Sequence, residues 1–168
     1  MTHHRTGLIV GRFDPPHLGH SFLVESAAAQ CDRLVVYVNS RDSDAAPGRL
    51  RAAWLAELHP DVCVVEVHHD LDTDWHDESL WARWIELFRS HWPHDANMRG
   101  IRGPDAVFSS EDYSAELARR LGAEPVVVDQ ERITVPISAT MIRNDPASHL
   151  AQLAPPVRAW VEANWVRR

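Results

Sequence analysis

Five short apolar runs, each rich in β-branched residues, alternate along the chain with longer segments of helical periodicity. Such runs are typical of strands buried on both faces, and the alternation predicts a parallel sheet joined by right-handed crossovers. We expect a Rossmann-like doubly wound α/β fold with helices on both faces and a helical C-terminal segment. The predicted strands are residues 7–11, 34–38, 62–67, 106–108 and 124–129; the predicted helices are residues 18–30, 49–58, 78–91, 110–121 and pieces from 138 onward.

The chain has 168 residues and no internal repeat or linker, so we expect one domain over residues 1–168, with 138–168 as its helical C-terminal part. In doubly wound sheets, ligands bind at the carboxyl ends of the strands. The loops that follow residues 10, 38, 67, 108 and 128 are therefore the places where a functional site is expected.

The composition excludes several classes of function. A net charge of -7 argues against a general binder of nucleic acid or of acidic membranes. All 17 basic residues are arginine, which excludes a lysine-bearing P-loop, a Schiff-base lysine and the kinase chemistry built on such a loop. Only Cys31 and Cys63 carry thiols, and no long apolar segment is present. We expect a reduced, cytoplasmic protein without a membrane span. The sequence leaves open whether the protein forms a homo-oligomer.

The segment after the first predicted strand has the features of an anion site. Gly11 allows a close approach of backbone to ligand, and His17 and His20 lie one turn apart where the next helix begins, on either side of Gly19. Unpaired N–H groups at a helix start attract anions. Two alternatives remain open: the two histidines are zinc ligands, although no third ligand is near, or they are capping or surface residues without a role.

Two motifs carry a resemblance to a known superfamily. HLGH at residues 17–20 resembles the HxGH signature of the nucleotidyltransferases, and ISATMIR at residues 137–143 resembles their ISxTxxR signature. The match is more specific to the NadR-like nicotinamide mononucleotide (NMN) adenylyltransferases. The residues that carry it are Arg49, Leu50, Trp54, Leu80, Trp81, Val107–Glu111, Tyr113, Glu116, Leu117, Leu121, Gly122, Val128, Asp129 and Arg132.

The resemblance implies a reaction in which ATP and NMN give NAD and pyrophosphate, with Mg²⁺ arriving on ATP and no metal ligands of the protein's own. Catalytic roles fall to His17, His20 and Arg143. The implied ATP-binding residues are Gly11, Arg12, Phe13, Gly19, Ser138 and Thr140, and the implied NMN-binding residues are Asp14, Arg49 and Trp81. Because the overall charge opposes two anionic substrates, we expect Arg12, Arg49 and Arg143 to form a local positive cleft.

Several of these assignments have simpler alternatives. Arg49 also fits a solvated residue in the first turn of a helix, and Asp14 also fits a turn cap. Trp81 shares an apolar helical face with Trp84 and Phe88, so it also fits the core. The two signatures alone do not separate NMN from nicotinate mononucleotide, phosphopantetheine or FMN as acceptor. A non-catalytic nucleotide-sensing regulator is the remaining alternative from another class.

Overall fold

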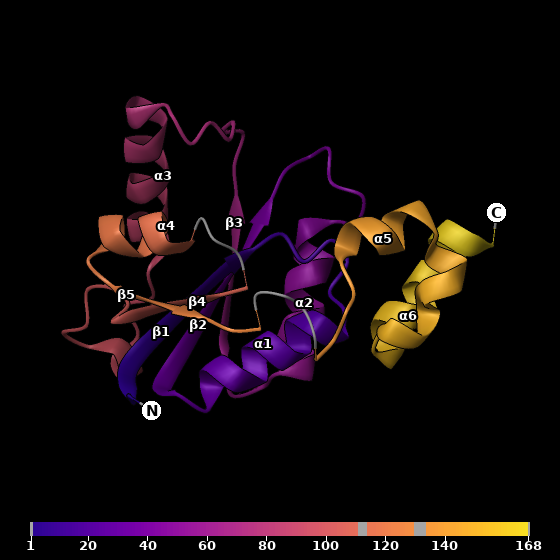
Figure 1. The fold of residues 1–168 in the computed structure, drawn as a ribbon, viewed down its shortest axis with the longest axis horizontal. Coiled ribbons are helices and arrows are strands. Elements are labelled where there is room, and N and C mark those ends of the chain that lie inside the picture. Colours follow the sequence, from indigo (N-terminus) through magenta and orange to yellow (C-terminus); the bar gives the residue numbers. More distant parts are fainter. Residues whose placement is uncertain (1, 111–113, 130–133, 168) are drawn as a thin grey trace.

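A computed structural model describes residues 2–110, 114–129 and 134–167. Its centre is a parallel sheet with the strand order β3-β2-β1-β4-β5 (Figure 1). The strands are β1 (His4–Gly11), β2 (Cys31–Ser40), β3 (Cys63–His68), β4 (Ala106–Ser109) and β5 (Glu124–Val127). The order reverses at β1, because the chain runs outward to β3 on one side and to β5 on the other. The predicted Rossmann-like doubly wound sheet is confirmed.

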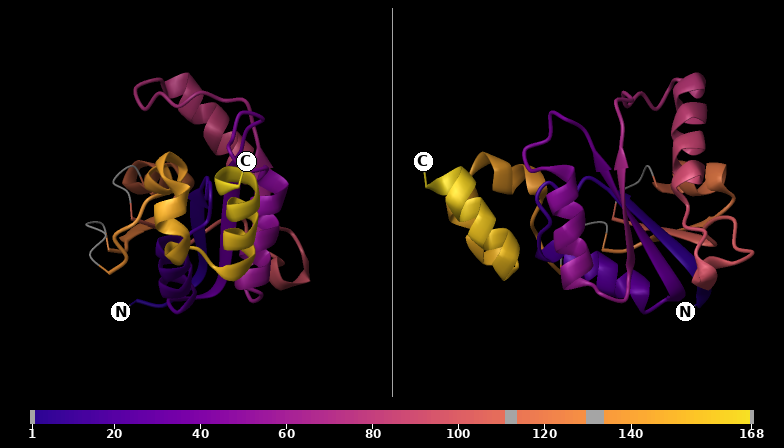
Figure 2. Two further views of the ribbon diagram at one scale, coloured as in Figure 1. Left: turned by 90° about the vertical axis from the view of Figure 1, so that its right-hand side faces the viewer. Right: turned by 180° about the vertical axis from the view of Figure 1, so that it is seen from behind.

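Helices cover both faces of this sheet, as the two rotated views show (Figure 2). α1 (Leu18–Ala28) and α2 (Gly48–Leu58) pack on one face, where they meet Ile9 and Val36. α3 (Glu78–His91) and α4 (Ser114–Leu121) pack on the other, where they meet Leu8 and Val35. Neighbouring residues of one strand thus enter two different apolar layers, which is why the strands are apolar without alternation.

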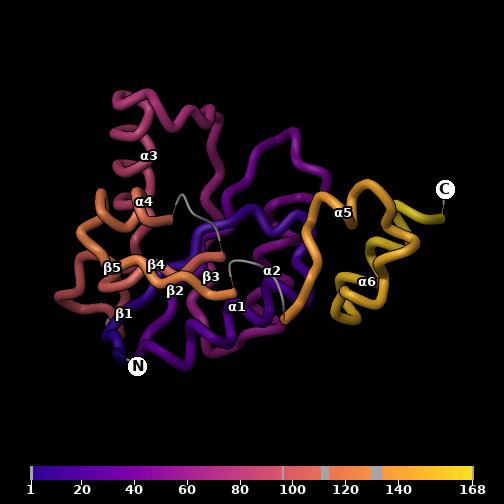
Figure 3. Tube along the Cα trace, viewed as in Figure 1, coloured from indigo at the N-terminus to yellow at the C-terminus, as the bar shows by residue number. Residues whose placement is uncertain are grey.

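The C-terminal part is a set of short helices beyond α2, visible at the right of the Cα trace in Figure 3. It consists of α5 (Ala139–Asn144), η2 (Pro146–Gln152), α6 (Pro155–Val161) and η3 (Glu162–Val166). Ile142, Leu153 and Val157 form a third apolar cluster with Trp54 of α2. Among the described residues, the helices are too short or too polar to cross a lipid bilayer.

The structure moves several predicted boundaries. β1 and β2 begin three residues earlier than predicted, because His4 pairs with Cys31 and the ladder accepts polar residues at its ends. β5 ends at Val127 rather than at 129, since Asp129 has a φ of 47° and leaves the extended region. α1 ends at Ala28 rather than at 30. Residues 111–113 of the predicted 110–121 helix lie outside the described residues, and within the described residues α4 begins at Ser114. α3 spans 78–91 as predicted, with Asp77 as its cap.

Gly48, at the start of α2, occupies a position with no space for a side chain. A Cβ there would collide with the side chains of Ser40 and Glu66, which hydrogen-bond to each other at 2.7 Å. We expect Gly48→Ala to destabilise the protein by about 1–3 kcal/mol, the usual cost of overpacking, although alanine is the better helix former. Urea unfolding measures this, with Gly103→Ala as the matched control because nothing lies within 4 Å of that position. Equal stability of both variants would contradict the packing argument.

Candidate active site

Two cavities open at the carboxyl end of the sheet and share Val10, Gly11 and Arg12 at the end of β1. The first, the histidine cavity, has a volume of about 310 Å³ and lies between the β1–α1 loop and the start of α5. The second, the aromatic cavity, has a volume of about 420 Å³ and lies between the end of β2 and α3. A ligand in either cavity would therefore touch the same strip of backbone.

The histidine cavity brings together most of the residues that the sequence singled out. Its lining includes His17, His20, Arg143, Gly11, Arg12, Phe13, Gly19, Ser138, Thr140 and Asp14. These residues come from two segments separated by more than a hundred positions in the chain. The two motifs thus line one cavity.

His17 and His20 form a reciprocal cap at the start of α1. Nδ1 of His17 accepts hydrogen bonds from the backbone N–H groups of Gly19 (3.0 Å) and His20 (3.3 Å), and Nδ1 of His20 accepts one from the backbone N–H of His17 (3.1 Å). The rings stack with centroids 3.6 Å apart. A neutral imidazole whose Nδ1 accepts carries its proton on Nε2. In this tautomer both rings carry their N–H group on Nε2.

Gly19 and Phe13 hold these rings in place. A Cβ at Gly19 would lie 2.9 Å from Cε1 of His17, so glycine is needed to admit the His17 ring. Gly19 also lines the histidine cavity, so its implied role in binding ATP stays a prediction. Phe13, buried and at a φ of 53°, contacts His20 edge-on with ring centroids 4.7 Å apart. The rings of the site are thus supported on several sides.

α5 brings the second motif to the same cavity. Ser138 caps α5 by accepting a hydrogen bond from the backbone N–H of Met141 (3.2 Å). Arg143 donates to Oγ1 of Thr140 (3.3 Å) and to the backbone carbonyl of Asp14 in the β1–α1 loop. Arg143 therefore ties the C-terminal helices to the loop that carries the histidines.

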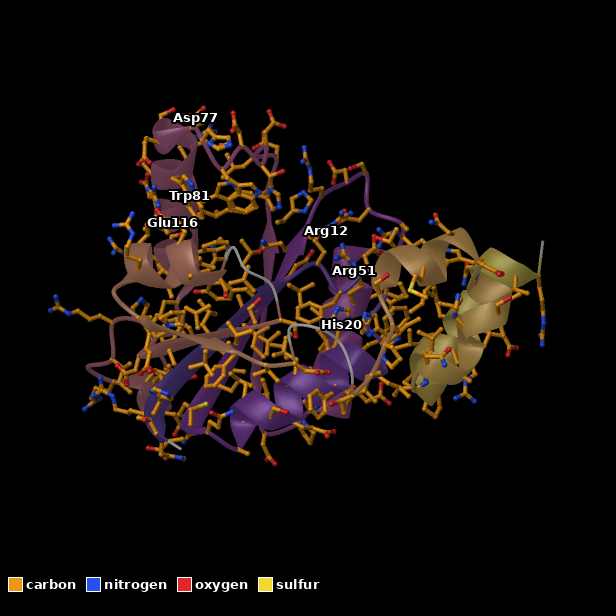
Figure 4. All side chains as sticks on the ribbon, in the orientation of Figure 1. Arg12, His20, Arg51, Asp77, Trp81 and Glu116 are labelled. Carbon is orange, nitrogen blue, oxygen red and sulfur yellow. The ribbon has the colours of Figure 1, made fainter. Side chains whose placement is uncertain are left out.

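Arg51 is the central residue that the sequence analysis missed. Its side chain is fully buried in α2, whereas Arg12 remains largely exposed (Figure 4). It donates to the carbonyls of Ala46 (2.9 Å), Arg12 and Asn39 (3.2 Å) and to the carboxylate of Asp44. One guanidinium thus joins the β1–α1 loop, the end of β2 and the loop before α2.

Asp44 balances this buried cation. Burial alone would raise the pKa of Asp44, but the backbone N–H of Arg41 and the guanidinium of Arg51 outweigh burial, and the pKa is lowered. Arg12 also donates to Asp44, at 3.0 Å. The ionised carboxylate is therefore the stable form in the folded protein, and its contribution to stability is lost only as the pH falls through the lowered pKa.

Asp14 and Arg49 differ in how the structure places them. The buried carboxylate of Asp14 accepts hydrogen bonds from the backbone N–H groups of Ala45 (2.9 Å) and Ala46 (2.8 Å), so it caps the neighbouring loop rather than its own turn. Arg49 is exposed and lines neither cavity. The structure brings Arg12 and Arg143 together but leaves Arg49 outside, while Arg41 lines the aromatic cavity instead.

Trp81 is both a core residue and a wall of the aromatic cavity. It is 4% exposed, and the guanidinium of Arg120 lies 4.6 Å from its ring centroid. Its indole N–H donates to the carbonyl of Trp75 (3.1 Å), whose ring centroid lies 5.2 Å away. The remaining aromatic lining, which the sequence analysis did not assign to a site, is Trp75, Trp84, Phe88 and His69. The sequence contained a signal for two of these residues, because His69 and Trp75 lie in the loop after β3, at the edge of the sheet where ligands are expected.

The described residues were compared with what a protein-bound metal ion would need. Within residues 2–110, 114–129 and 134–167, no group of three acidic, histidine or cysteine side chains is arranged to hold a metal ion. Nδ1 of both His17 and His20 accepts hydrogen bonds from backbone N–H groups, so in the neutral ring Nε2 carries the proton. Neither nitrogen then has a lone pair for zinc, which does not fit the zinc alternative. Glu111, Tyr113 and Arg132, which belong to the family resemblance, lie outside the described residues.

The fold and the two motifs are similar to those of nucleotidyltransferases, and the family model described as cytidylyltransferase-like matches residues 8–50. The chain is similar in particular to the trifunctional NAD biosynthesis/regulator protein NadR of Escherichia coli and of Salmonella typhimurium. Each relative is 28% identical over 83% of this chain and 36% of its own length. The chain thus spans about a third of those relatives, and the predicted resemblance to NadR-like proteins is confirmed.

Solved structures give the same fold. A NadR protein in complex with NAD and AMP-PNP has a TM-score of 0.64 and 23% identity, and the match covers 90% of this chain and 45% of that one. A bifunctional NMN adenylyltransferase/ADP ribose pyrophosphatase from Francisella tularensis, in complex with AMP and a manganese ion, has a TM-score of 0.62 and 11% identity. That match covers 97% of this chain and 50% of the other.

Proposed function

We propose that this domain transfers the adenylyl group of ATP to the 5′-phosphate of NMN, giving NAD and pyrophosphate. The observation that carries the proposal is the pair of cavities that meet at the end of β1. One is lined by histidine, arginine and hydroxyl groups suited to a triphosphate, and the other by aromatic rings suited to a flat base. The shared strip at Val10, Gly11 and Arg12 is where the two phosphates would meet.

ATP binds in the histidine cavity in this proposal. His17 and His20 donate Nε2–H groups to the phosphates, with His20 stabilising the charge that builds up in the transition state. Arg143 meets the β- and γ-phosphates through its planar fork, with the hydroxyls of Ser138 and Thr140 beside it. Gly11, Arg12, Phe13 and Gly19 complete the binding surface.

NMN binds in the aromatic cavity in this proposal. A cationic pyridinium is attracted to the face of an aromatic ring, and Trp81 lies in the cavity wall. Arg12 and Arg41 supply positive charge for the phosphate from the lining. Asp14 acts by holding the loop before α2 in place. The contact between Arg49 and the NMN phosphate stays a prediction, and it requires the exposed Arg49 side chain to reach into the cavity from the surface.

The chemistry needs alignment more than proton transfer. The second pKa of a phosphate monoester is about 6, so the attacking oxygen of NMN is already ionised at neutral pH. The enzyme then has to bring that oxygen in line with the α-phosphorus and stabilise the charge of the departing pyrophosphate. Mg²⁺ would arrive with ATP and offset part of the negative charge of its phosphates, which requires few protein carboxylates.

An acceptor panel tests the proposal. The protein is incubated with ATP, Mg²⁺ and one of NMN, nicotinate mononucleotide, phosphopantetheine or FMN, and pyrophosphate release is followed. We expect the highest kcat/KM with NMN. A higher value with another acceptor would keep the transferase class and reject NMN. Nucleotide binding without turnover of any acceptor would support the regulator instead.

Arg143→Lys separates the geometry of the guanidinium from its charge. Lysine keeps the positive charge but loses the paired donors that meet two phosphate oxygens and the contact with the β1–α1 loop. We expect kcat/KM for ATP to fall roughly tenfold, equivalent to about 1.4 kcal/mol, while the KM for NMN changes little. Steady-state kinetics with each substrate varied in turn measures this. Full activity of Arg143→Lys would reject a paired contact with phosphate.

A further inference from the structure

Arg12 is the arginine that the two cavities share, and the end of its side chain lies between them. It lines both cavities, and its Nη2 lies 3.0 Å from Oδ1 of Asp44 and 3.8 Å from Oδ2 of Asp14. Asp14 lines the histidine cavity, whereas Arg41 and Ser43, in the same loop as Asp44, line the aromatic cavity. The guanidinium of Arg12 therefore lies at the junction of the two cavities.

One buried ion pair holds Arg12 at both ends. The backbone carbonyl of Arg12 accepts a hydrogen bond from the buried guanidinium of Arg51, which lies beside it (Figure 4). At the other end, Nη2 of Arg12 donates to Asp44, whose side chain is 2% exposed. Asp44 is itself fixed, since its second oxygen accepts hydrogen bonds from Arg51 and from the backbone N–H of Arg41 (2.8 Å). The Arg12 side chain thus has a fixed anchor, although 59% of it is exposed.

The contact with Asp44 uses only part of the Arg12 guanidinium. Among the described residues, Nη2 is the one atom of this side chain that donates a hydrogen bond, so the N–H groups on Nε and Nη1 remain for an anion. A long exposed side chain loses rotamer freedom when it binds a ligand, and a side chain that is already held loses less. Arg12 can therefore contact Asp44 on one side and a phosphate on the other.

We infer that Asp44 is a positioning residue, which holds the guanidinium of Arg12 at the junction of the two cavities, where it meets the phosphates of both substrates. The inference rests on the proposed function, which assigns the triphosphate of ATP and the 5′-phosphate of NMN to the two sides of this junction. Asp44 touches neither substrate, because its carboxylate is buried and both of its oxygens accept hydrogen bonds from protein donors. Loss of Asp44 should therefore impair the use of both substrates, whereas Arg143→Lys is expected to affect mainly ATP.

A double-mutant cycle of Arg12→Ala and Asp44→Asn tests the inference. Asparagine has nearly the same shape as aspartate but no charge, and we expect kcat/KM for ATP and for NMN each to fall about tenfold. In the Arg12→Ala background, Asp44→Asn should cause a further loss of less than about twofold, because no guanidinium is left to position. The kinetics are measured well below the thermal midpoint of each variant. Asp42→Asn is the matched control, since Asp42 lies in the same loop, has a side chain that is 99% exposed and lines neither cavity.

A purely structural role predicts a different pattern. If Asp44 acts only by stabilising Arg51, Asp44→Asn lowers kcat/KM by the same factor in the wild-type and Arg12→Ala backgrounds, and that result would overturn the inference. Full activity of Asp44→Asn or of Arg12→Ala would overturn it as well. So would a higher kcat/KM in Asp44→Asn, which would mean that Asp44 withholds Arg12 from phosphate. If Asp44→Asn does not fold, Asp44→Glu takes its place in the cycle, because it keeps a charge near Arg51 but moves the carboxylate.

The same cycle, measured on the Kd of ATP with Mg²⁺, separates this inference from the proposed function. If the wild-type protein does not use NMN, the proposed function fails, but the affinity for ATP should still fall in Asp44→Asn and change little further in the double variant. An equal loss of affinity in both backgrounds would contradict the positioning role, whichever acceptor the protein uses. A wild-type protein that does not bind ATP would contradict both proposals.

Discussion

His20→Ala is expected to lower kcat by about a hundredfold or more, the scale for losing one preorganised donor in a transition state. His20 lies in the histidine cavity with its ring held between His17 and Phe13, and its Nδ1 is used by the backbone, so Nε2–H is the donor that would be lost. Binding of NMN, measured by calorimetry, should stay nearly unchanged because NMN is assigned to the other cavity.

Two variants separate this catalytic role from the cap. His20→Asn places Oδ1 where Nδ1 was, so it can keep the cap while the Nε2–H donor is lost, and we expect kcat to stay low. His94→Ala, at an exposed position outside both cavities, is the control for a general effect of removing a histidine. Stoichiometric zinc in the wild-type protein that disappears in His20→Ala would favour the metal-ligand alternative and contradict the assignment.

Arg51→Met is expected to have the largest effect on stability, a loss of about 3–5 kcal/mol. It leaves the buried carboxylate of Asp44 with only the largely exposed Arg12 as a cation, and it leaves three backbone carbonyls without this donor. Methionine fills a similar length but satisfies none of the three carbonyls or Asp44. The difference from wild type in urea unfolding should shrink at acidic pH, since a protonated Asp44 no longer needs the guanidinium. A loss that is the same at every pH would contradict the charge argument.

Arg49→Met is the matched control for stability, because Arg49 lies in the same helix and is exposed. A surface substitution of this kind should change stability by less than about 0.5 kcal/mol. Arg51→Lys keeps the charge but cannot donate to all the same partners, so we expect a loss of stability between those of wild type and Arg51→Met. The KM of Arg49→Met for NMN tests separately whether Arg49 meets the NMN phosphate.

The contrast between Arg49 and Arg51 shows where prediction from the sequence ends. Leu50, Trp54 and Leu55 correctly indicated an apolar face of α2, and an arginine beside that face is normally solvated. Burial of Arg51 depends on Asp44 and on carbonyls from three separate segments that meet only in the folded chain. No periodicity within α2 contains that information.

The assembly of the histidine cavity could be predicted because its cause is topological. A parallel sheet brings the end of β1 and the loops of its neighbours to one edge, so motifs far apart in the chain can meet there. The wall around Trp81 could be predicted only in part. The apolar face of α3 was evident, but whether its rings border a cavity depends on the path of the loop after β3, to which the indole N–H of Trp84 is tied through the carbonyl of Asp72 (2.9 Å).

The central claim is that one phosphate from each substrate meets at the end of β1. The most direct test supplies NMN, Mg²⁺ and ATP labelled at the α-phosphorus, and follows the label through the products. The account predicts that the label appears in NAD in a one-to-one ratio with released pyrophosphate, and that both signals fall together in His20→Ala. Label that appears only in AMP or ADP, with no NAD formed, would contradict it.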